Sequence, residues 1–517
     1  MGQAPILAIP PFPGTKRLFF ARWIGKRHDA REDPDTLLDA LARKRVGGCY
    51  WGRQKTLPGS AYVLDGTGER GIDSMPWPAC DDPWHLLKEA EFARLPENDP
   101  RALLVLAAGI PLVLVSQDGA VRDACAHDKE RLTSALLSGW QFQNPFNGSD
   151  ITTLEAIALC GMWRALIDAN RRIHSVMGIA YWKKKTVSPL VWPGARVPYG
   201  KALDDIPADG AVAIWRARLS SGEERAIARR DPPVIEIEDG FIRSAGLGAD
   251  CVPPLSIIVD ALGPHFAPGA PSELETLLQE GEFPPDLLIR ARNLRHAIIA
   301  GGLSKYEAGG VATIPRYGGA RRHVLVPGQV EDDRAVTSGG ALASNLELLR
   351  RAREEVGSEA YVIYKPHPDV LAGHRRGMIP EPDMAALADR IETDAPMPAL
   401  IEMVDELHVN SSLAGFEALL RGKQVTVHGV PFYAGWGLTV DRGPVPARRT
   451  NRRTLDELVA AALLLYPRYL DPETGLPCPA EMLVERLAAG APTLDSAAKA
   501  IVTVRRAAGR VRRLVAH

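Results

Sequence analysis

From Ile151 onward the sequence alternates short runs of β-branched residues with stretches of helical periodicity. The strands expected at Val234–Ile237 and His323–Val326, for example, are separated by a helix expected at Pro285–Ala300. Strands separated by helices predict βαβ units and parallel sheets. Two series of this kind are divided near Tyr317–Arg322, so we expect an α/β fold with two doubly wound, Rossmann-like lobes that face a cleft.

The remaining elements follow the same alternation. Strands are predicted at Ala211–Trp215, Ser256–Val259, Tyr361–Tyr364, Glu406–Val409 and Gln424–Val427, and helices at Ser272–Gln279, Ser338–Arg353 and Ser412–Arg421, with an amphipathic helix beginning at Ile151. The first 140 residues carry turn signals and few clean periods.

The pattern divides the chain into four parts. We expect an N-terminal accessory region at residues 1–150, a Rossmann-like lobe with a leading helix at 151–318, a second lobe at 319–450, and a C-terminal helical segment with a basic tail at 451–517. The tail has five arginines between Lys499 and Leu514. It is predicted either to contact an anionic membrane surface or to be a solvated terminus.

Composition excludes some classes of protein. Lys and Arg number 62 against 63 Asp and Glu, a balance that argues against a general nucleic-acid-binding protein. The longest apolar run, Ala102–Val115, is too short to span a bilayer, and no secretory signal is visible. Six cysteines are scattered without a Cys-x-x-Cys pair, which indicates small buried hydrophobic residues rather than a zinc site or a disulfide scaffold.

Four loops that follow predicted strands are rich in polar residues, and ligands of parallel sheets bind at such strand ends. The first loop contains Glu238, Asp239 and Arg243, whose guanidinium offers a bidentate fork for a carboxylate or phosphate. The alternative is a surface turn with a local Glu–Arg pair. The second loop, Pro327–Asp333, ends in three consecutive acids, which are either a solvated turn or the source of a nucleophile beside the cleft.

The third loop, Lys365–Asp369, contains two prolines. They would fix the backbone and hold Lys365 and His367 outward, an arrangement that suits the phosphate of a nucleotide. The alternative is a stiff turn in which Asp369 caps the next segment.

The fourth loop opens the helix expected within Asn410–Leu420. Ser411 or Ser412 can cap this helix, whose free N–H groups favour an anion, and Glu417 could reach ribose hydroxyls. The alternative is a well-capped helix without a ligand. No Asp-x-Asp motif appears that would clearly hold a nucleotide-bound divalent ion, so we predict a site that uses no metal.

Together these stretches resemble the bacterial capsule polysaccharide synthesis family, specifically its KpsC-type β-Kdo transferases. The matching text is EDGFIRSAGLG (238–248), VPPLSIIVD (252–260), GLSKY (302–306), PGQVEDDRAV (327–336), YKPHPDVLAGHRRG (364–377), NSSLAGFEALLRGK (410–423), YAGWGLTVDR (433–442) and LYPRYLDPETG (465–475). The segments keep a fixed order over residues 178–475, more than half of the chain.

The resemblance implies a GT-B-like, retaining glycosyltransferase with CMP-β-Kdo as its donor substrate and no further cofactor. The implied acceptor is a lipid-linked Kdo of the lysophosphatidylglycerol type at the cytoplasmic face of the inner membrane. Peripheral contact with that membrane and with capsule assembly proteins is expected, and nucleic acid is not an expected partner. Residues 151–318 would then be the acceptor-side lobe and residues 319–450 the CMP lobe.

The predicted catalytic residues are Asp333, Gln329, Glu238, Asp239 and Arg243, and the predicted nucleotide-binding residues are Lys365, His367, Ser411, Ser412 and Glu417. In the family, an acid of a Gln-x-x-x-Asp stretch is the candidate nucleophile, and the spacing of Gln329 and Asp333 fits. Arg243 is the cation expected near the carboxylate of the sugar.

The chain departs from the family in the number of modules. Related proteins commonly carry two transferase modules, whereas residues 1 to about 150 lack the corresponding motifs. Ala102–Val115 faintly echoes FEALLRGKQVTV, so this region is either a decayed module or an accessory domain. The leader Gly178–Lys183 favours β-(2→7) transfer. The rival functions are a nucleotide-sugar epimerase or an inverting transferase on the same scaffold, and a non-catalytic capsule export or scaffold protein.

Overall fold

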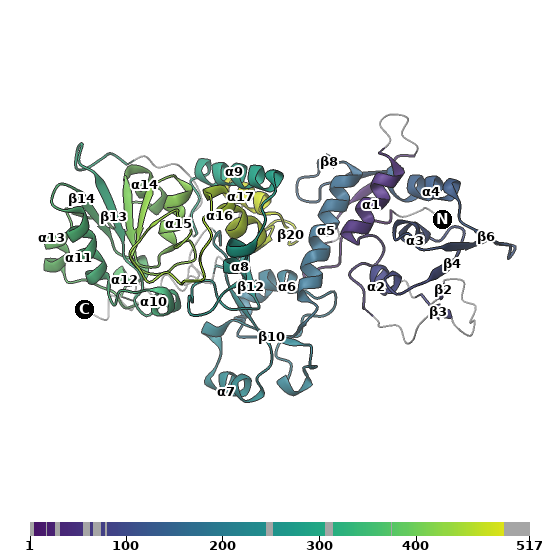
Figure 1. Cartoon of the computed structure of the whole chain (residues 1–517), viewed down its shortest axis with the longest axis horizontal. Coiled ribbons are helices and arrows are strands. Elements are labelled where there is room, and N and C mark those ends of the chain that lie inside the picture. The colour runs from purple at the N-terminus through teal and green to yellow at the C-terminus, as the bar shows by residue number, and fades with distance from the viewer. Residues whose placement is uncertain are drawn as a thin grey trace.

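The computed structural model describes residues 5–16, 18–25, 32–54, 63–65, 74–77, 80–244, 252–305, 314–373 and 375–490. Within this part of the chain the strands form two six-stranded sheets, one five-stranded sheet and one three-stranded sheet. Figure 1 shows the N-terminal elements at one end of the long axis, β13 and β14 at the other, and the elements around β12 between them. We call the six-stranded sheet that contains β12 the first sheet and the one that contains β13 the second sheet.

The second sheet is parallel throughout, as the sequence predicts. Its order is β15-β14-β13-β16-β17-β18. The strands are β13 (His323–Pro327), β14 (Tyr361–Lys365), β15 (Arg390–Ile391), β16 (Glu406–Val409), β17 (Gln424–Val427) and β18 (Val440–Asp441). The order reverses between β13 and β16, and the crevice at such a reversal is where ligands of doubly wound sheets bind.

Helices cover both faces of the second sheet. They are α10 (Arg334–Gly339), α11 (Asn345–Val356), α12 (Pro368–Leu371), α13 (Glu381–Leu387), α14 (Met397–Met403) and α15 (Leu413–Leu420). The single helix expected at Ser338–Arg353 is wrong, because α10 ends at Gly339 and Ser344 caps a new helix through Glu347 N–H. In the break, the N–H groups of Ala341 and Leu342 donate to the Asn410 side chain instead of continuing a helix.

The first sheet is only half parallel, which corrects the prediction of a parallel sheet. Its order is β20-β19-β12-β11-β10-β9. Parallel strands β9 (Ile173–Met177), β10 (Ala211–Ile214) and β11 (Val234–Asp239) are followed by antiparallel β12 (Ser256–Asp260), β19 (Arg468–Leu470) and β20 (Pro477–Cys478). Antiparallel neighbours need no helical crossover, and the sequence offers no helical pattern between β11 and β12.

Two of these strands come from the C-terminal segment that was expected to be helical. The helices in the two stretches of chain that build the first sheet are η2 (Tyr181–Lys183), α6 (Lys184–Leu190), η3 (Leu203–Asp205), η4 (Arg216–Arg218), α7 (Ser221–Arg230), α8 (Glu273–Glu280), α9 (Pro285–Ala300), α16 (Leu455–Val459), η6 (Ala460–Leu465) and α17 (Ala480–Ala488). The chain therefore returns from the second sheet to complete the first. The predicted basic tail, 499–517, lies outside the described residues.

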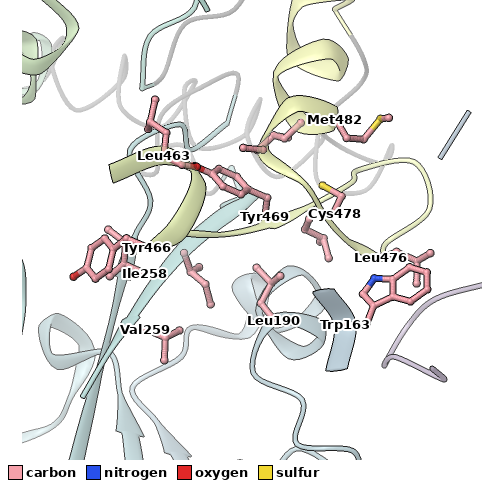
Figure 2. Close-up of a cluster of buried hydrophobic side chains, with 14 of the residues drawn as sticks. Trp163, Leu190, Ile258, Val259, Leu463, Tyr466, Tyr469, Leu476, Cys478 and Met482 are labelled. Atoms are coloured by element: carbon pink, nitrogen blue, oxygen red, sulfur yellow. The ribbon is translucent and has the colours of Figure 1, made fainter. Parts of the chain in front are cut away.

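A buried apolar cluster joins the first sheet to the N-terminal region. Figure 2 shows Tyr469 and Cys478 of the returning strands near Leu190 of α6 and Trp163 of α5 (Thr153–Asn170). Trp163 is fully buried, and its indole N–H donates to the Pro477 carbonyl at 2.9 Å. The long helix α5 thus anchors the N-terminal region to the edge of the first sheet.

The N-terminal region is itself α/β, although its sequence shows few clean periods. Its two sheets have the orders β3-β2-β4-β5-β6 and β1-β7-β8. The elements are β1 (Ala21–Trp23), α1 (Pro34–Lys44), β2 (Val63–Asp65), β3 (Ser74–Pro76), α2 (Pro83–Leu87), β4 (Phe92–Pro96), α3 (Ala102–Ala107), β5 (Leu112–Val115), β6 (Val121–Asp123), α4 (Ala126–Thr133), η1 (Ser134–Ser138), β7 (Trp140–Gln143) and β8 (Asp150–Ile151).

The apolar run Ala102–Val115 is divided between helix α3 and strand β5. Among the residues that the structure describes, no helix is both long enough and apolar enough to cross a membrane. The expectation of buried cysteines holds for Cys160 and Cys478, but Cys80 and Cys125 are exposed.

Candidate active site

The loops after β13 and β16 meet at the reversal of strand order in the second sheet. Ser411 N–H donates to Gln329 Oε1 at 2.9 Å, and Gln329 Nε2 donates to Ser411 Oγ at 3.3 Å. Ser411 Oγ also lies 3.1 Å from the Ala335 carbonyl, to which it donates. Two residues predicted separately are therefore held together, one on each side of the crevice.

Asp333 caps α10 at the end of the loop after β13. Its Oδ1 accepts a hydrogen bond from Ala335 N–H at 2.9 Å, and its side chain is exposed. Oδ2 makes no hydrogen bond within the described residues. The two acids before it are engaged elsewhere, since Asp332 pairs with Arg375 at 3.1 Å and Glu331 accepts from Asn345 N–H. The helix cap thus fixes the Asp333 carboxylate through Oδ1 and does not use Oδ2.

His367 is the N-cap residue of α12. The alternative prediction had given the capping role to Asp369. The backbone N–H of Asp369 donates to His367 Nδ1 at 3.2 Å, so this hydrogen bond assigns the proton to Nε2. Burial lowers the pKa of His367, with Arg375 and Lys305 acting in the same direction, whereas Asp369 and Asp333 oppose the shift. Near neutral pH the ring is uncharged and offers an Nε2–H donor.

Lys365 is not held outward, which corrects the prediction. It is the last residue of β14, is only 7% exposed, and donates from Nζ to the Ala395 carbonyl at 2.8 Å. The side chain is directed at the loop between β15 and α14, because that loop supplies backbone carbonyls to a lysine that is otherwise buried.

The helix after β16 is capped by Ser412, whose Oγ accepts from Ala414 N–H at 3.2 Å. Glu417 is buried on this helix. Its Oε1 accepts a hydrogen bond from the backbone N–H of Lys305 at 2.9 Å. Glu417 therefore connects α15 to the turn that follows α9, and its expected contact with ribose stays a prediction.

Glu238, near the end of β11, forms an ion pair with a residue of the second sheet's helix α10. Arg334 of α10 donates to Glu238 Oε1 at 2.7 Å and to Glu236 Oε2 at 3.1 Å. Burial raises the pKa of Glu238 to about 7, helped by Asp239 and Glu236 and opposed by Arg334 and Lys183. A carboxyl group with this pKa can accept or donate a proton near neutral pH.

The guanidinium of Arg243 is turned inward, so the expected fork toward a ligand is used within the protein. Arg243 is fully buried, with Nε 2.9 Å from Asp239 Oδ2 and Nη2 donating to the Val252 carbonyl at 2.8 Å. Nη1 donates to Ser244 Oγ at 2.8 Å. The local ion pair that forms joins Asp239 to Arg243 and is buried, so it differs in its acid and in its burial from the alternative prediction of a surface turn with a Glu–Arg pair.

Asp239 also has a second cationic neighbour, Lys183. The Lys183 ammonium lies 3.5 Å from Asp239 Oδ1 and 3.2 Å from the centre of the Trp215 ring. Burial lowers the pKa of Lys183 to about 8, and Arg243 adds to this shift while Asp239 opposes it. Although burial acts to raise it, the pKa of Asp239 is held below its usual range by Lys183, Arg243 and Lys305.

Sequence reasoning missed three cationic residues that the fold gathers here, namely Lys183, Lys305 and Arg334. Lys305 lies where the two sheets meet: its N–H donates to Glu417, and its carbonyl accepts from Arg243 N–H at 3.3 Å. The positive charge of Lys305 also acts on Asp239 and His367. Lys183 lies in the leader Gly178–Lys183, Lys305 in GLSKY and Arg334 in PGQVEDDRAV, so their place in these stretches was the signal that the sequence offered.

A family model described as "Capsule polysaccharide biosynthesis protein" matches residues 210–300 and 304–469, which include both sets of site loops. The solved structure of KpsC, beta Kdo 2,4 transferase, from Thermosulfurimonas dismutans is 33% identical, with a TM-score of 0.54. The match covers 61% of this chain and 98% of that one. This chain belongs to the capsule polysaccharide biosynthesis family.

Relatives in this capsule family differ in length. Capsule polysaccharide modification protein LipA of Neisseria meningitidis is 37% identical over 352 residues, covering 66% of this chain and 49% of LipA. Lipopolysaccharide-processing protein LpsZ of Rhizobium meliloti is 46% identical over 263 residues, covering 50% of this chain and 59% of LpsZ. The chain therefore spans about half the length of LipA and somewhat more of LpsZ.

Proposed function

We propose that this protein is a retaining β-Kdo transferase that uses CMP-β-Kdo to extend the Kdo linker on a lipid acceptor in capsular polysaccharide biosynthesis. The scaffold would be GT-B-like, with the first and second sheets as two lobes around a cleft. One observation carries the proposal: the Gln329–Ser411 pair lies at the strand-order reversal, and Arg334 beside it reaches Glu238 of the other sheet. Membership of the capsule family and the Kdo-transferase structure it resembles support the reaction class.

In the first step, Asp333 Oδ2 attacks the anomeric carbon of Kdo, and the bond from that carbon to the phosphate oxygen breaks. CMP leaves with the bonding electron pair, and its phosphate is already ionised, so it needs positive partners more than a general acid. His367 supplies the Nε2–H donor, and the start of α15 supplies backbone N–H groups. These groups make a metal unnecessary in the proposed mechanism.

In the second step, an acceptor hydroxyl attacks the anomeric carbon, and the carbon–Oδ2 bond breaks to restore the Asp333 carboxylate. Glu238 takes the hydroxyl proton, a role for which a pKa of about 7 is suitable. Two displacements at one carbon retain its configuration. Because Arg243 is turned inward, we assign the cation near the sugar carboxylate to Lys305, whose charge acts on groups of both sheets.

The deciding experiment incubates purified protein with CMP-Kdo, generated in situ, and a synthetic Kdo-lipid acceptor. Mass spectrometry detects the extended lipid, and NMR reads the anomeric configuration and the linkage. We expect one added β-Kdo, with an unchanged rate in the presence of a chelator. Consumption of CMP-Kdo to free sugar without extension would instead indicate an epimerase or hydrolase, and no consumption would indicate a scaffold.

The same product decides the linkage. The leader Gly178–Lys183 favours 2→7 transfer, while the solved relative is named as a 2,4 transferase. An NMR assignment of the glycosylated carbon separates the two, and acceptors of one and two Kdo residues test which length is extended.

We propose peripheral attachment to the cytoplasmic face of the inner membrane through the basic tail. Deleting residues 499–517 and measuring sedimentation with anionic liposomes tests this. Reduced binding of the truncated protein with unchanged transfer to a short soluble acceptor is expected, and equal binding by both proteins would remove the tail from the proposal.

A further inference from the structure

The face of the second sheet that α11 covers is apolar over β13 and β14 but polar over β16 and β17. The apolar half is one buried cluster that includes Val324, Val326 and Leu349. Strand register pairs Val324 with Glu406, so Glu406 and His408 of β16 lie on this same face. Buried polar side chains cost free energy unless they are paired, so the polar half needs a compensating arrangement.

Two imidazoles meet in this polar half. His408 Nδ1 lies 3.2 Å from His428 Nε2, and the two residues are 0% and 3% exposed. His408 Nε2 lies 3.0 Å from Glu406 Oε1, which also accepts from Thr426 Oγ1 at 2.9 Å. Because a carboxylate only accepts, the His408 proton is on Nε2, and the Nδ1 lone pair is directed at His428.

Glu355, near the end of α11, adds a carboxylate to the pair. One donor atom from each of Glu355, His408 and His428 lies within 4.8 Å of the other two. Two nitrogen ligands of a tetrahedral zinc ion, each about 2.05 Å from it, are separated by about 3.3 Å. The observed 3.2 Å between the ring nitrogens is therefore a distance that one ion spans.

We propose that Glu355, His408 and His428 form a binding site for a divalent transition-metal ion, zinc above all. Two imidazoles, one carboxylate and a water molecule are ligands that zinc accepts. The hydrogen bond from His408 to Glu406 is the carboxylate–histidine pairing that orients metal-bound imidazoles.

Nearby arginines set the expected strength of this site. Arg442 pairs with Glu355 Oε1 at 2.7 Å, so Oε2 is the oxygen left for an ion. Arg351 also lies close to His428. Their positive charges oppose a cation, so we expect the affinity to be lower than that of a structural zinc site built from thiolates.

The ion would join β16, β17 and α11 directly behind the loop that carries Ser411. β16 ends at Val409 and leads into this loop, and His428 follows β17. A bound ion would thus stabilise the second sheet, and the site is separate from the residues proposed for sugar transfer. It does not rest on the proposed function, because metal binding is measured without any sugar substrate.

The test uses full-length protein stripped with a chelator and titrated with Zn²⁺ by calorimetry and with Co²⁺ by visible absorption. We expect one site per chain, the intense visible bands of tetrahedral Co²⁺, and a higher melting temperature with zinc. His428→Gln should abolish the Co²⁺ bands, and Glu355→Gln should weaken zinc binding about tenfold or more.

Glu354→Gln, on the exposed side of the same helix, is the matched control and should bind zinc like the wild type. Glu355 is partly exposed, so Glu355→Gln carries the test if His428→Gln does not fold. Zinc affinity that is equal in the wild type and in the folded variants would overturn the proposal. The two rings would then be joined only by a histidine–histidine hydrogen bond.

Discussion

The N-terminal region and the second sheet contain the same β–α–β unit but differ in the loop that follows its first strand. β4, α3 and β5 form a parallel pair with a connecting helix, and β16, α15 and β17 do the same. The faint sequence echo between Ala102–Val115 and FEALLRGKQVTV falls on these matching helix–strand segments. The presence of this unit therefore does not by itself distinguish the two regions.

The loops after the first strand of each unit make the difference. After β4, Asp99 pairs with Arg101 at 2.6 Å and Glu97 pairs with Arg122 at 2.8 Å, so local partners neutralise the acids. After β16, Ser411 instead reaches Gln329 on the neighbouring strand's loop. Polar strand-end loops therefore form a candidate site where a neighbouring strand and a facing sheet add further polar groups. They do not form one where their charged residues pair with one another.

We expect replacement of Asp333 to have the strongest effect on transfer, and a small effect would contradict the distinction between the two sets of loops. Asp333→Asn keeps a capping side chain on α10 but removes the nucleophile, so transfer should fall by more than about 1,000-fold, roughly 4 kcal/mol of barrier. Asp333→Ala should fall as far and also lose about 1 kcal/mol of stability with the cap. Initial rates and urea denaturation measure both effects.

Asp99→Ala, in the corresponding loop after β4, is the control and should keep the wild-type rate. More than about a tenth of the wild-type rate in Asp333→Ala, a barrier change under about 1.4 kcal/mol, would contradict the assignment. Asp332 would then be the next residue to replace.

Glu238→Gln should lower the transfer rate about 100-fold and remove the acidic limb of the pH–rate profile. The raised pKa means that Glu238 is protonated below about pH 7, so a general base loses activity as the pH falls through that value. Because the fold favours the protonated Glu238 carboxyl, proton binding at Glu238 stabilises the folded state. This stabilisation is fully present below pH 4.5 and is lost as the pH rises through about 7. Rates and melting temperatures between pH 5 and 9 test both signs.

Glu97→Gln, on the loop after β4, is the matched control and should leave the pH–rate profile unchanged. A profile of Glu238→Gln that keeps the wild-type limb would assign that limb to another group.

His367→Ala should weaken CMP binding about tenfold, because a donor to the phosphate is lost. Lys365→Ala should weaken CMP binding less and destabilise the second sheet, because the Ala395 carbonyl loses a buried ammonium partner. Calorimetry with CMP and thermal unfolding separate the two effects. Arg101→Ala, a cation of the N-terminal loop, should leave CMP affinity unchanged. Unchanged affinity in both His367→Ala and Lys365→Ala would leave Lys365–Asp369 as a structural turn.

A weaker effect is expected in the loop after β4 of the N-terminal region. Asp99→Ala should cost about 1 kcal/mol of unfolding free energy, because the Arg101 side chain and backbone N–H lose their carboxylate partner. Transfer rate and CMP affinity should not change. A loss of transfer with intact stability would show that the N-terminal region takes part in the reaction.

Much of the fold is predictable from local patterns. The predicted bounds of α9, β16 and β17 agree with the structure, because hydrophobic periodicity and capping residues act over a few positions. The antiparallel half of the first sheet was not predictable in this way. β12 pairs with β19, more than 200 residues later, and no local pattern reports such a partner.

The strand–helix alternation, the polar loops at strand ends and the resemblance that their motifs carry can all be recognised in the amino-acid sequence. The directions of those side chains depend on how distant segments pack in the fold. Lys365 and Arg243 turn inward because Ala395 and Val252 offer backbone carbonyls as partners. The approach of His408 to His428 likewise depends on two strands lying side by side. Side-chain direction follows the partners that distant segments bring, and a pattern of neighbouring residues does not encode them.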